Sequence, residues 1–302
     1  MKVKKGNELM RVLITGCYGQ VGHCLTQQLA DEEWITLLAL DRYQLDITNQ
    51  NTVNNIVDDF QPTIIINAAA YTAVDKAEEE VELSYAINRD GPKYLAQAAQ
   101  NVSAAILHIS TDYVFEGNKE GEYTEKDATN PQGVYGESKL AGEIGIAETC
   151  DKHIILRTAW VFGEHGNNFV KTMLRLGEKR DELSIVGDQF GGPTYAGDIA
   201  HALIQIAKRI AEGDEVEYGI YHYSGLPHVS WFEFAEAIFD TAVKQNVISS
   251  KPNLTSITTD QYPTPAKRPS NSRLSTYKIT SHFNIKASDW RSVLNNIQVY
   301  KD

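Results

Sequence analysis

The stretch that decides the fold is MRVLITGCYGQVGHCLTQQLA, residues 10–30. It opens with the short apolar run of a buried strand, and residues 20–30 have the apolar spacing of a helix. Between the two, Gly16, Gly19 and Gly22 follow the pattern G-x-x-G-x-x-G, in which glycines permit a tight turn and let the backbone approach a pyrophosphate. The charge of a pyrophosphate is favoured at a helix N-terminus. This strand–turn–helix unit therefore predicts a dinucleotide-binding site.

A glycine motif taken alone can also be an ordinary turn between a strand and a helix. Its position favours the dinucleotide, because Asp41 ends the second predicted strand and lies 19 positions after Gly22, near the spacing of a ribose-binding carboxylate. Asp41 favours NAD, since a carboxylate repels a 2′-phosphate, whereas the adjacent Arg42 could pair with that phosphate. NADH and NADPH both stay open as cofactors.

Outward from this unit, short apolar runs alternate with helical patterns. Each run is continuously apolar, as in parallel strands that are covered on both faces. This alternation predicts an α/β fold, with right-handed crossovers and a Rossmann-like, doubly wound parallel sheet. The strands are expected at residues 10–15, 35–41, 62–68, 104–110 and 153–162, and the helices at residues 20–30, 51–60 and 89–100.

The pattern is less regular after residue 162. Residues 187–194 and 261–274 are rich in turn-forming residues and are expected to be loops, while residues 219–225 could form a returning strand. An amphipathic helix is expected over residues 229–245, capped by Ser230.

The length of the chain favours two domains. At roughly 150 residues per domain, 302 residues make about two domains or one large one. We expect a dinucleotide-binding domain over residues 10–165, joined by the returning strand. Residues 166–302 should form mainly a smaller substrate-binding lobe over the carboxyl edge of the sheet. Residues 1–9 are interpreted as an extension.

Composition excludes several classes of function. A net charge of −12 opposes binding to nucleic-acid phosphates. No apolar run approaches the ~18 residues of a membrane span, and Val12-Leu13-Ile14 is too short for the core of a signal peptide. Three cysteines without a CxxC pair fit reduced thiols. We therefore expect a cytoplasmic protein without nucleic-acid or membrane partners.

The pattern most suggestive of chemistry is Tyr135-x-x-x-Lys139, which places both side chains on one face of the helix expected after Pro131. A lysine ammonium one turn away would lower the pKa of the phenol from its usual value of about 10. The pair could then donate a proton to a carbonyl oxygen while a nicotinamide delivers hydride to the carbon. The same spacing also occurs by chance on solvated helix faces.

Support comes from the segment STDYVF, residues 110–115, at the end of a predicted buried strand. Thr111 in this segment lies 24 positions before Tyr135. Ligand sites in doubly wound sheets lie beyond the carboxyl ends of the strands, so this hydroxyl is well placed to bind a substrate oxygen.

These segments resemble the extended short-chain dehydrogenase/reductases and, within them, the dTDP-4-dehydrorhamnose reductase branch. The glycine turn and Y-x-x-x-K mark only the superfamily, whereas NAAAYTAVDKAE, STDYVF and DQFGGPT are far more specific to the branch. The matching segments extend through nearly the whole chain: LITGCYGQVG (13–22), NAAAYTAVDKAE (67–78), STDYVF (110–115), YGESKLAGE (135–143), RTAWVFG (157–163), DQFGGPT (188–194) and RPSNSRL (268–274).

The resemblance implies reduction of the C4 ketone of dTDP-4-dehydro-L-rhamnose by NAD(P)H, giving dTDP-L-rhamnose. Tyr135 would protonate the new alkoxide, Thr111 would hydrogen-bond the same oxygen, and Lys139 would tune Tyr135 and hold the nicotinamide ribose. The cofactor-binding residues would be Gly16, Gly19, Gln20, Val21, Gly22, Asp41, Arg42, Asp46, Ile47, Ala68, Ala69, Ala70, Tyr135 and Lys139. The sugar nucleotide would contact Thr111, Asp112 and Trp160.

Two other functions stay open. A sugar-nucleotide 4,6-dehydratase or epimerase would share the fold but regenerate a tightly bound nicotinamide. A non-catalytic regulatory subunit is the second alternative, because the regulatory partner of methionine adenosyltransferase is similar to this branch.

Several further residues allow two interpretations. Arg268 and Arg273 are either ordinary surface charges or ligands of the substrate diphosphate. Trp160 is by default a core residue, and only the resemblance places it against the substrate. We interpret Asp75 and Glu78 as a capping box at a helix start. Some family members have Mg²⁺ at a dimer contact, so Mg²⁺ and a homodimer stay open, with no metal ligands assigned.

Overall fold

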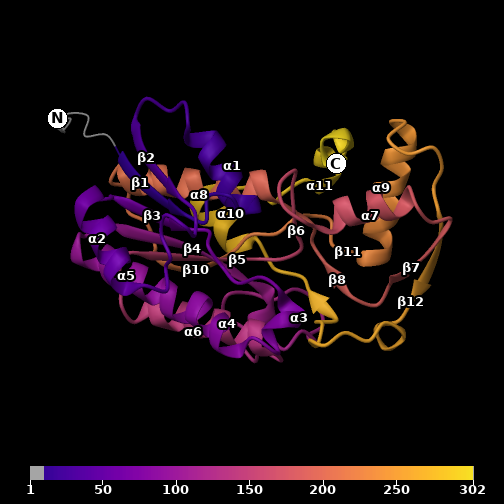
Figure 1. The fold of residues 1–302 in the computed structure, drawn as a ribbon, viewed down its shortest axis with the longest axis horizontal. Coiled ribbons are helices and arrows are strands. Elements are labelled where there is room, and N and C mark those ends of the chain that lie inside the picture. The colour runs from indigo at the N-terminus through magenta and orange to yellow at the C-terminus, as the bar shows by residue number, and fades with distance from the viewer. Residues whose placement is uncertain (1–9, 302) are drawn as a thin grey trace.

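A six-stranded parallel sheet forms the centre of the molecule. The computed structural model describes residues 10–301, so the predicted extension lies outside the described residues. The strand order β10-β5-β4-β3-β1-β2 confirms the predicted doubly wound α/β fold (Figure 1). Its strands are β1 (Met10–Thr15), β2 (Ile35–Leu40), β3 (Ile64–Asn67), β4 (Ala105–Thr111), β5 (His153–Thr158) and β10 (Gly219–His222).

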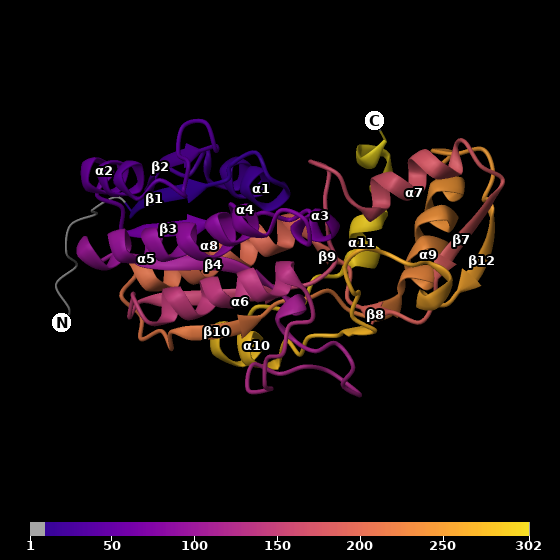
Figure 2. The same ribbon diagram turned by 60° about the horizontal axis from the view of Figure 1, so that its bottom comes forward.

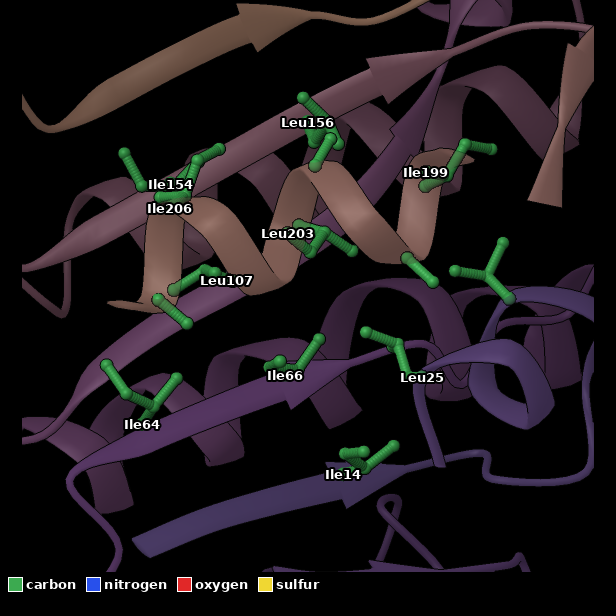
Figure 3. Close-up of a cluster of buried hydrophobic side chains, with 14 of the residues drawn as sticks. Ile14, Leu25, Ile64, Ile66, Leu107, Ile154, Leu156, Ile199, Leu203 and Ile206 are labelled. Carbon is green, nitrogen blue, oxygen red and sulfur yellow. The ribbon is translucent and has the colours of Figure 1, made fainter. Parts of the chain in front are cut away.

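Helices cover both faces of this sheet (Figure 2). On one face, Leu25 of α1 and Leu203 of α8 pack against alternate strand residues such as Ile14 and Ile66 (Figure 3). The intervening strand residues, such as Ile65, face the opposite core, as the period of two in a strand requires. The first face carries α1 (Gln20–Leu29), α8 (Ala196–Ala211) and α10 (Tyr277–Phe283), and the second carries α2 (Gln50–Phe60), α5 (Gly91–Asn101) and α6 (Val134–Ala147).

The order of the strands reverses beside β1, whose neighbours are β2 on one side and β3 on the other. Ligands of doubly wound sheets bind beyond the carboxyl ends of the strands at such a point. The glycine turn follows β1, and the three alanines of residues 68–70 follow β3. Both segments therefore lie at this edge of the sheet.

A second hydrophobic core lies beside the carboxyl end of the sheet. It joins residues from Phe162 to Tyr300, and its helices and strands stand apart from the sheet in Figure 1. The predicted helix is present, and Ser230 caps it in a capping box with Glu233. The elements here are α7 (Phe169–Gly177), β7 (Glu182–Val186), α9 (Trp231–Lys244), β12 (Asn253–Ile257) and α11 (Trp290–Leu294).

Three elements that follow residue 165 belong to the sheet layers: α8, β10 and α10. The division at residue 165 stays a prediction. None of the helices within residues 10–301 combines the length and the apolar character that a membrane span requires.

Several short elements were not predicted. The expected strand over 153–162 ends at Thr158, because the chain bends at Trp160, whose φ is +51°. The expected loop over residues 187–194 contains one short strand, β8, and the first residue of another, β9. The short strands are β6 (Val161–Phe162), β8 (Phe190–Gly191), β9 (Thr194–Tyr195), β11 (Val229–Ser230) and β13 (Asn271–Ser272), and the short helices are α3 (Val74–Ala77), α4 (Val81–Tyr85), η1 (Ala86–Asp90), η2 (Asp112–Val114), η3 (Thr259–Gln261) and η4 (Ile297–Tyr300).

Candidate active site

The glycine turn packs directly against the segment that follows β3. Gly16 has a φ of +72°, and a Cβ there would lie 2.7 Å from the Ala69 Cα. A Cβ on Gly22 would lie 2.0 Å from the Gly16 carbonyl oxygen, so both positions require glycine. Gly19 is the N-cap of α1, and no side chain caps this helix. The first N–H groups of α1 can therefore bind an anion, as a dinucleotide pyrophosphate requires.

Other residues predicted to bind the cofactor lie at the same edge. Gln20 and Val21 begin α1, and three alanines, residues 68–70, follow β3. The Ala68 N–H donates to the carbonyl oxygen of Thr15 at 3.1 Å, which fixes this segment beside β1. The small side chains of residues 68–70 leave the backbone of this segment accessible to a cofactor.

Asp41 and Arg42 follow β2 in the next loop along this edge. One Asp41 carboxylate oxygen accepts the N–H groups of Tyr43 and Gln44, both at 2.9 Å. The Arg42 guanidinium donates to the Tyr43 hydroxyl at 2.8 Å and lies over its ring. The Asp41 carboxylate is therefore hydrogen-bonded to the backbone of the turn. The Arg42 side chain instead contacts the Tyr43 side chain.

Asp46 and Ile47 lie further along this loop. Asp46 accepts hydrogen bonds from the Thr48 N–H at 2.9 Å and from its hydroxyl at 2.8 Å. Ile47 is buried, and a Cβ on Gly91 would lie 2.6 Å from its Cδ1. Its side chain therefore belongs to the core beneath α5 and leaves only its backbone for a cofactor contact.

Tyr135 and Lys139 lie in the first two turns of α6. The first N–H of this helix, at Val134, donates to the Glu78 carboxylate at 2.9 Å, so an acid from a distant segment caps it. The predicted capping box of Asp75 and Glu78 is therefore wrong. No side chain caps α3, because these two carboxylates bind partners outside it.

Thr111 ends β4 and joins Tyr135 to Asp112. Its side chain hydrogen-bonds that of Tyr135, and its hydroxyl donates to the Asp112 carboxylate at 3.1 Å. Asp112 is buried, which raises the pKa of its carboxyl to about 6. The predicted triad residues Thr111, Tyr135 and Lys139 thus lie where β4 and α6 meet.

The pKa values of Tyr135 and Lys139 differ from what the sequence predicts. Burial of the phenol raises the pKa of Tyr135, and the hydrogen bond with Thr111 opposes that shift only in part. Burial lowers the pKa of Lys139 to about 8, with the Glu143 carboxylate acting in the opposite direction. The predicted lowering of the Tyr135 pKa by Lys139 is not found in the protein alone, because the Lys139 ammonium donates to the Ile109 carbonyl oxygen at 2.7 Å.

Trp160 lies beyond β5, with its indole stacked on that of Trp231 at 3.5 Å between ring centroids. A Cβ on Gly191 would lie 2.5 Å from this indole, so the absence of a side chain there makes room for it. A left-handed φ is rare for a bulky residue and often marks a functional position.

Arg268 and Arg273 occupy different sides of this region. Arg268 donates to the Asp75 carboxylate at 2.6 Å and to the Tyr113 hydroxyl at 3.2 Å. The ring of Tyr113 meets that of Tyr135 edge-on, at 5.3 Å between centroids. Arg273 lies over the ring of Phe190, 5.7 Å from its centroid. Arg268 is therefore the one adjacent to the tyrosines.

Sequence reasoning missed a set of buried polar residues beneath the triad. Glu143 forms a two-pronged ion pair with Arg157 at 2.6 and 2.9 Å and accepts from the Ser110 hydroxyl at 2.5 Å. Asn67 and His108 lie at neighbouring positions of β3 and β4. The available signal was a polar residue inside an otherwise apolar strand, as in IIIN, ILHIS and HIILRT.

Within residues 10–301, no three His, Cys, Asp or Glu side chains are grouped so that they could hold a metal ion. The suggestion of Mg²⁺ therefore has no support in this part of the chain.

Comparisons with known proteins show the family of this chain. The model of the RmlD substrate binding domain matches residues 10–300. A dTDP-4-dehydrorhamnose reductase from Aggregatibacter actinomycetemcomitans is 54% identical, over 97% of this chain and 100% of that protein. The reductase of the same name from Escherichia coli K12 is 43% identical, over 93% and 95%. The solved structure of dTDP-4-dehydrorhamnose reductase from Bacillus anthracis, in complex with NADP, is 39% identical, with a TM-score of 0.88 over 95% of this chain and 98% of that one. The chain therefore belongs to the RmlD family, in which these relatives are dTDP-4-dehydrorhamnose reductases.

Proposed function

We propose that this protein reduces the C4 ketone of dTDP-4-dehydro-L-rhamnose with NAD(P)H and releases dTDP-L-rhamnose. The observation that carries the proposal is the meeting of Thr111, Tyr135 and Lys139 beside a glycine turn that fits a dinucleotide. The substrate in this proposal is taken from the similar proteins, which are named dTDP-4-dehydrorhamnose reductases. Three free thiols, Cys17, Cys24 and Cys150, support a reducing compartment such as the cytoplasm.

The residues of the turn would hold the cofactor. Its bound nicotinamide supplies the hydride that goes to C4. The N–H groups at the start of α1 bind the pyrophosphate, and the two required glycines let it approach the backbone. Asp41 would face the adenosine ribose, where it favours a 2′-hydroxyl.

Tyr135 acts as the proton donor in this proposal. Its raised pKa keeps the phenol protonated near neutral pH, so the acid is loaded before the reaction starts. The phenolic O–H bond breaks as the new O–H bond forms at the C4 oxygen, which leaves a phenolate on Tyr135. Thr111 holds the same oxygen by its hydroxyl, and a charged Lys139 stabilises the phenolate.

The decisive experiment mixes the purified protein with NADPH and dTDP-4-keto-6-deoxymannose. We expect one NADPH oxidised for each sugar nucleotide converted, and a product heavier by the mass of two hydrogens. Conversion without net NADPH consumption would indicate a dehydratase or epimerase instead. Binding without any conversion would indicate a regulatory subunit.

Tyr135→Phe tests the proton donor. The ring still packs against Tyr113, but the acid is gone, so kcat should fall by ~10²–10⁴-fold. The Kd of NADPH, measured by fluorescence, should change little because the glycine turn is untouched. A kcat like that of the wild type would remove Tyr135 from the mechanism.

A further inference from the structure

A chain of buried polar groups connects Lys139 to the end of β1. The Lys139 Nζ lies 3.4 Å from the His108 Nε2, and the His108 Nδ1 lies 2.9 Å from the Asn67 Nδ2. The Asn67 Oδ1 accepts from the Thr15 hydroxyl at 2.6 Å. Thr15, Asn67, His108 and Lys139 are all buried, and the proposed triad leaves His108 without a role.

The direction of these hydrogen bonds is fixed by the backbone. The Ala69 N–H donates to the Asn67 Oδ1 at 3.1 Å, and an N–H can only donate. The other end of the Asn67 amide, its NH₂ group, must therefore face His108. Because an amide NH₂ cannot accept, the His108 Nδ1 is the acceptor and the neutral imidazole carries its proton on Nε2.

This tautomer directs an N–H group at Lys139. An N–H suits the lone pair of a neutral amine and opposes a charged ammonium. Moving the proton to Nδ1 would set two donors against each other at Asn67, so the tautomer cannot adapt without loss of a buried hydrogen bond. Charging the ring is also opposed, because burial and the nearby Lys139 hold the pKa of His108 well below its usual range.

We propose that His108 is a positioning residue that, by holding its proton on Nε2, sets how readily Lys139 takes up its charge. The other groups around the Lys139 amine are the Ile109 carbonyl on β4 and the Glu143 carboxylate on α6, which is paired with Arg157 of β5. The glutamate favours the ammonium, and burial together with the His108 N–H disfavours it. The pKa of Lys139 is lowered to about 8 by this balance, so its charge changes near that pH.

The consequence for turnover rests on the proposed function. A charged Lys139 stabilises the phenolate left on Tyr135, so kcat should fall as Lys139 loses its proton at high pH. Removing the opposing N–H should favour the ammonium, raise the pKa of Lys139, and move this fall in kcat to higher pH.

The tautomer can be measured without any substrate. In protein labelled with ¹⁵N in its histidine rings, two-bond ¹H–¹⁵N spectra distinguish Nε2–H from Nδ1–H. His222 is an internal reference: it is buried, its pKa is lowered to about 3, and its Nδ1 lies 3.2 Å from the Tyr123 carbonyl oxygen, which requires Nδ1–H. We expect His108 to stay neutral from pH 6 to 8 as the Nε2–H form. An Nδ1–H form or a charged ring at His108 would overturn the proposal.

The pH profile supplies the second test. In His108→Asn the new carboxamide oxygen takes the place of Nδ1 and can accept from Asn67, but no N–H reaches Lys139. The high-pH fall in kcat should then move upward by about half to one pH unit, with the KM of the sugar nucleotide unchanged. His153→Asn is the matched control, because His153 begins β5 and binds the Cys150 carbonyl instead.

An unchanged profile in His108→Asn, or a shift to lower pH, would refute the role of His108. If this variant does not fold, the tautomer in the wild-type protein still decides the proposal. A protein with the Nε2–H tautomer that fails to reduce the keto sugar would contradict the proposed function and leave the assignment of His108 intact.

Discussion

Asp41 and Arg42, two adjacent side chains of opposite charge, are expected to set the choice between NADH and NADPH. Asp41 also accepts two backbone N–H groups, so Asp41→Ala would disturb the turn as well as remove the charge. Asp41→Asn keeps an accepting oxygen and removes only the charge. We expect it to shift the ratio of kcat/KM toward NADPH by about fivefold, since two exposed charges interact by about 1 kcal/mol.

Arg42→Ala is the matching change, and it should shift the same ratio toward NADH. A shift of Asp41→Asn toward NADH would contradict the placement of Asp41 beside the ribose.

Arg268 offers a second residue-scale prediction. Its ion pair with Asp75 holds the guanidinium beside Tyr113, on the side of Tyr135, which favours a role at the substrate diphosphate over an ordinary surface charge. Arg268→Ala should raise the KM of the sugar nucleotide about tenfold or more, as a lost charged hydrogen bond does, and leave the KM of the nicotinamide unchanged.

Arg273→Ala provides the comparison for this variant. If both variants keep the KM of the sugar nucleotide within about twofold of wild type, other groups hold the diphosphate.

Single residues of the site differ in how far the sequence reveals them. The glycine turn and Tyr135-x-x-x-Lys139 are local patterns that each span only a few consecutive residues. The contact between His108 and Lys139 joins residues 31 positions apart, and that between Asn67 and His108 joins residues 41 apart. The register of β3 and β4 determines the second pair, and the packing of α6 on the sheet determines the first, so the sequence shows that these residues are polar but not which partners they have.

At the scale of elements, α6 is the part on which the site depends. Two glycines on this helix permit close packing: a Cβ on Gly136 would lie 2.2 Å from the Tyr113 carbonyl oxygen, and one on Gly142 would lie 2.0 Å from that of Asn88. The buried Glu143 then binds Arg157 of β5. These contacts fix α6, with Tyr135, against the sheet.

The Glu143–Arg157 pair should therefore matter for stability. Glu143→Gln leaves the buried Arg157 without a compensating charge and should lower the free energy of unfolding by about 3–5 kcal/mol, measured by urea denaturation. The double variant Glu143→Gln with Arg157→Met should recover most of this loss, because it leaves no buried charge. A double variant less stable than the single one would show that the pair itself, and not the unpaired arginine, determines stability.

The sequence predicted some helices and strands correctly and missed others. The five predicted strands of the sheet are present because each is a continuous apolar run between turn signals. The helices α7 and α8 were not predicted, although both are amphipathic, because the glycine-rich and proline-rich segments around them suggested irregular structure. The strand expected over 153–162 was too long, since nothing in its apolar pattern indicates the bend at Trp160.

At the scale of the whole molecule, the second core could not have been derived from local pattern. It gathers side chains from Phe162 to Tyr300, while α8, β10 and α10 between them pack on the sheet. The chain therefore crosses between the two parts several times. Local periodicity reports which face of an element is buried, but it does not report which core buries it.

The stacked indoles of Trp160 and Trp231 join these two parts of the molecule. Trp160 follows β5 of the sheet, and Trp231 begins α9 of the second core. Trp160 has a left-handed φ of +51° and stacks on Trp231, and the family resemblance implies that it contacts the sugar nucleotide. The position of the second core should therefore affect the geometry of the substrate site through this contact.

Trp231→Leu tests this coupling. An aromatic pair contributes about 0.5–1.5 kcal/mol beyond burial, so the KM of the sugar nucleotide should rise about two- to tenfold, while that of the nicotinamide stays constant. The near-ultraviolet circular dichroism of the coupled indoles should disappear in the same variant. Trp34→Leu is the control, because Trp34 precedes β2 and lies beneath Lys208, away from this stack. Loss of the circular dichroism signal with an unchanged KM would show that Trp160 keeps its position without its partner, and that the second core does not govern substrate binding through this contact.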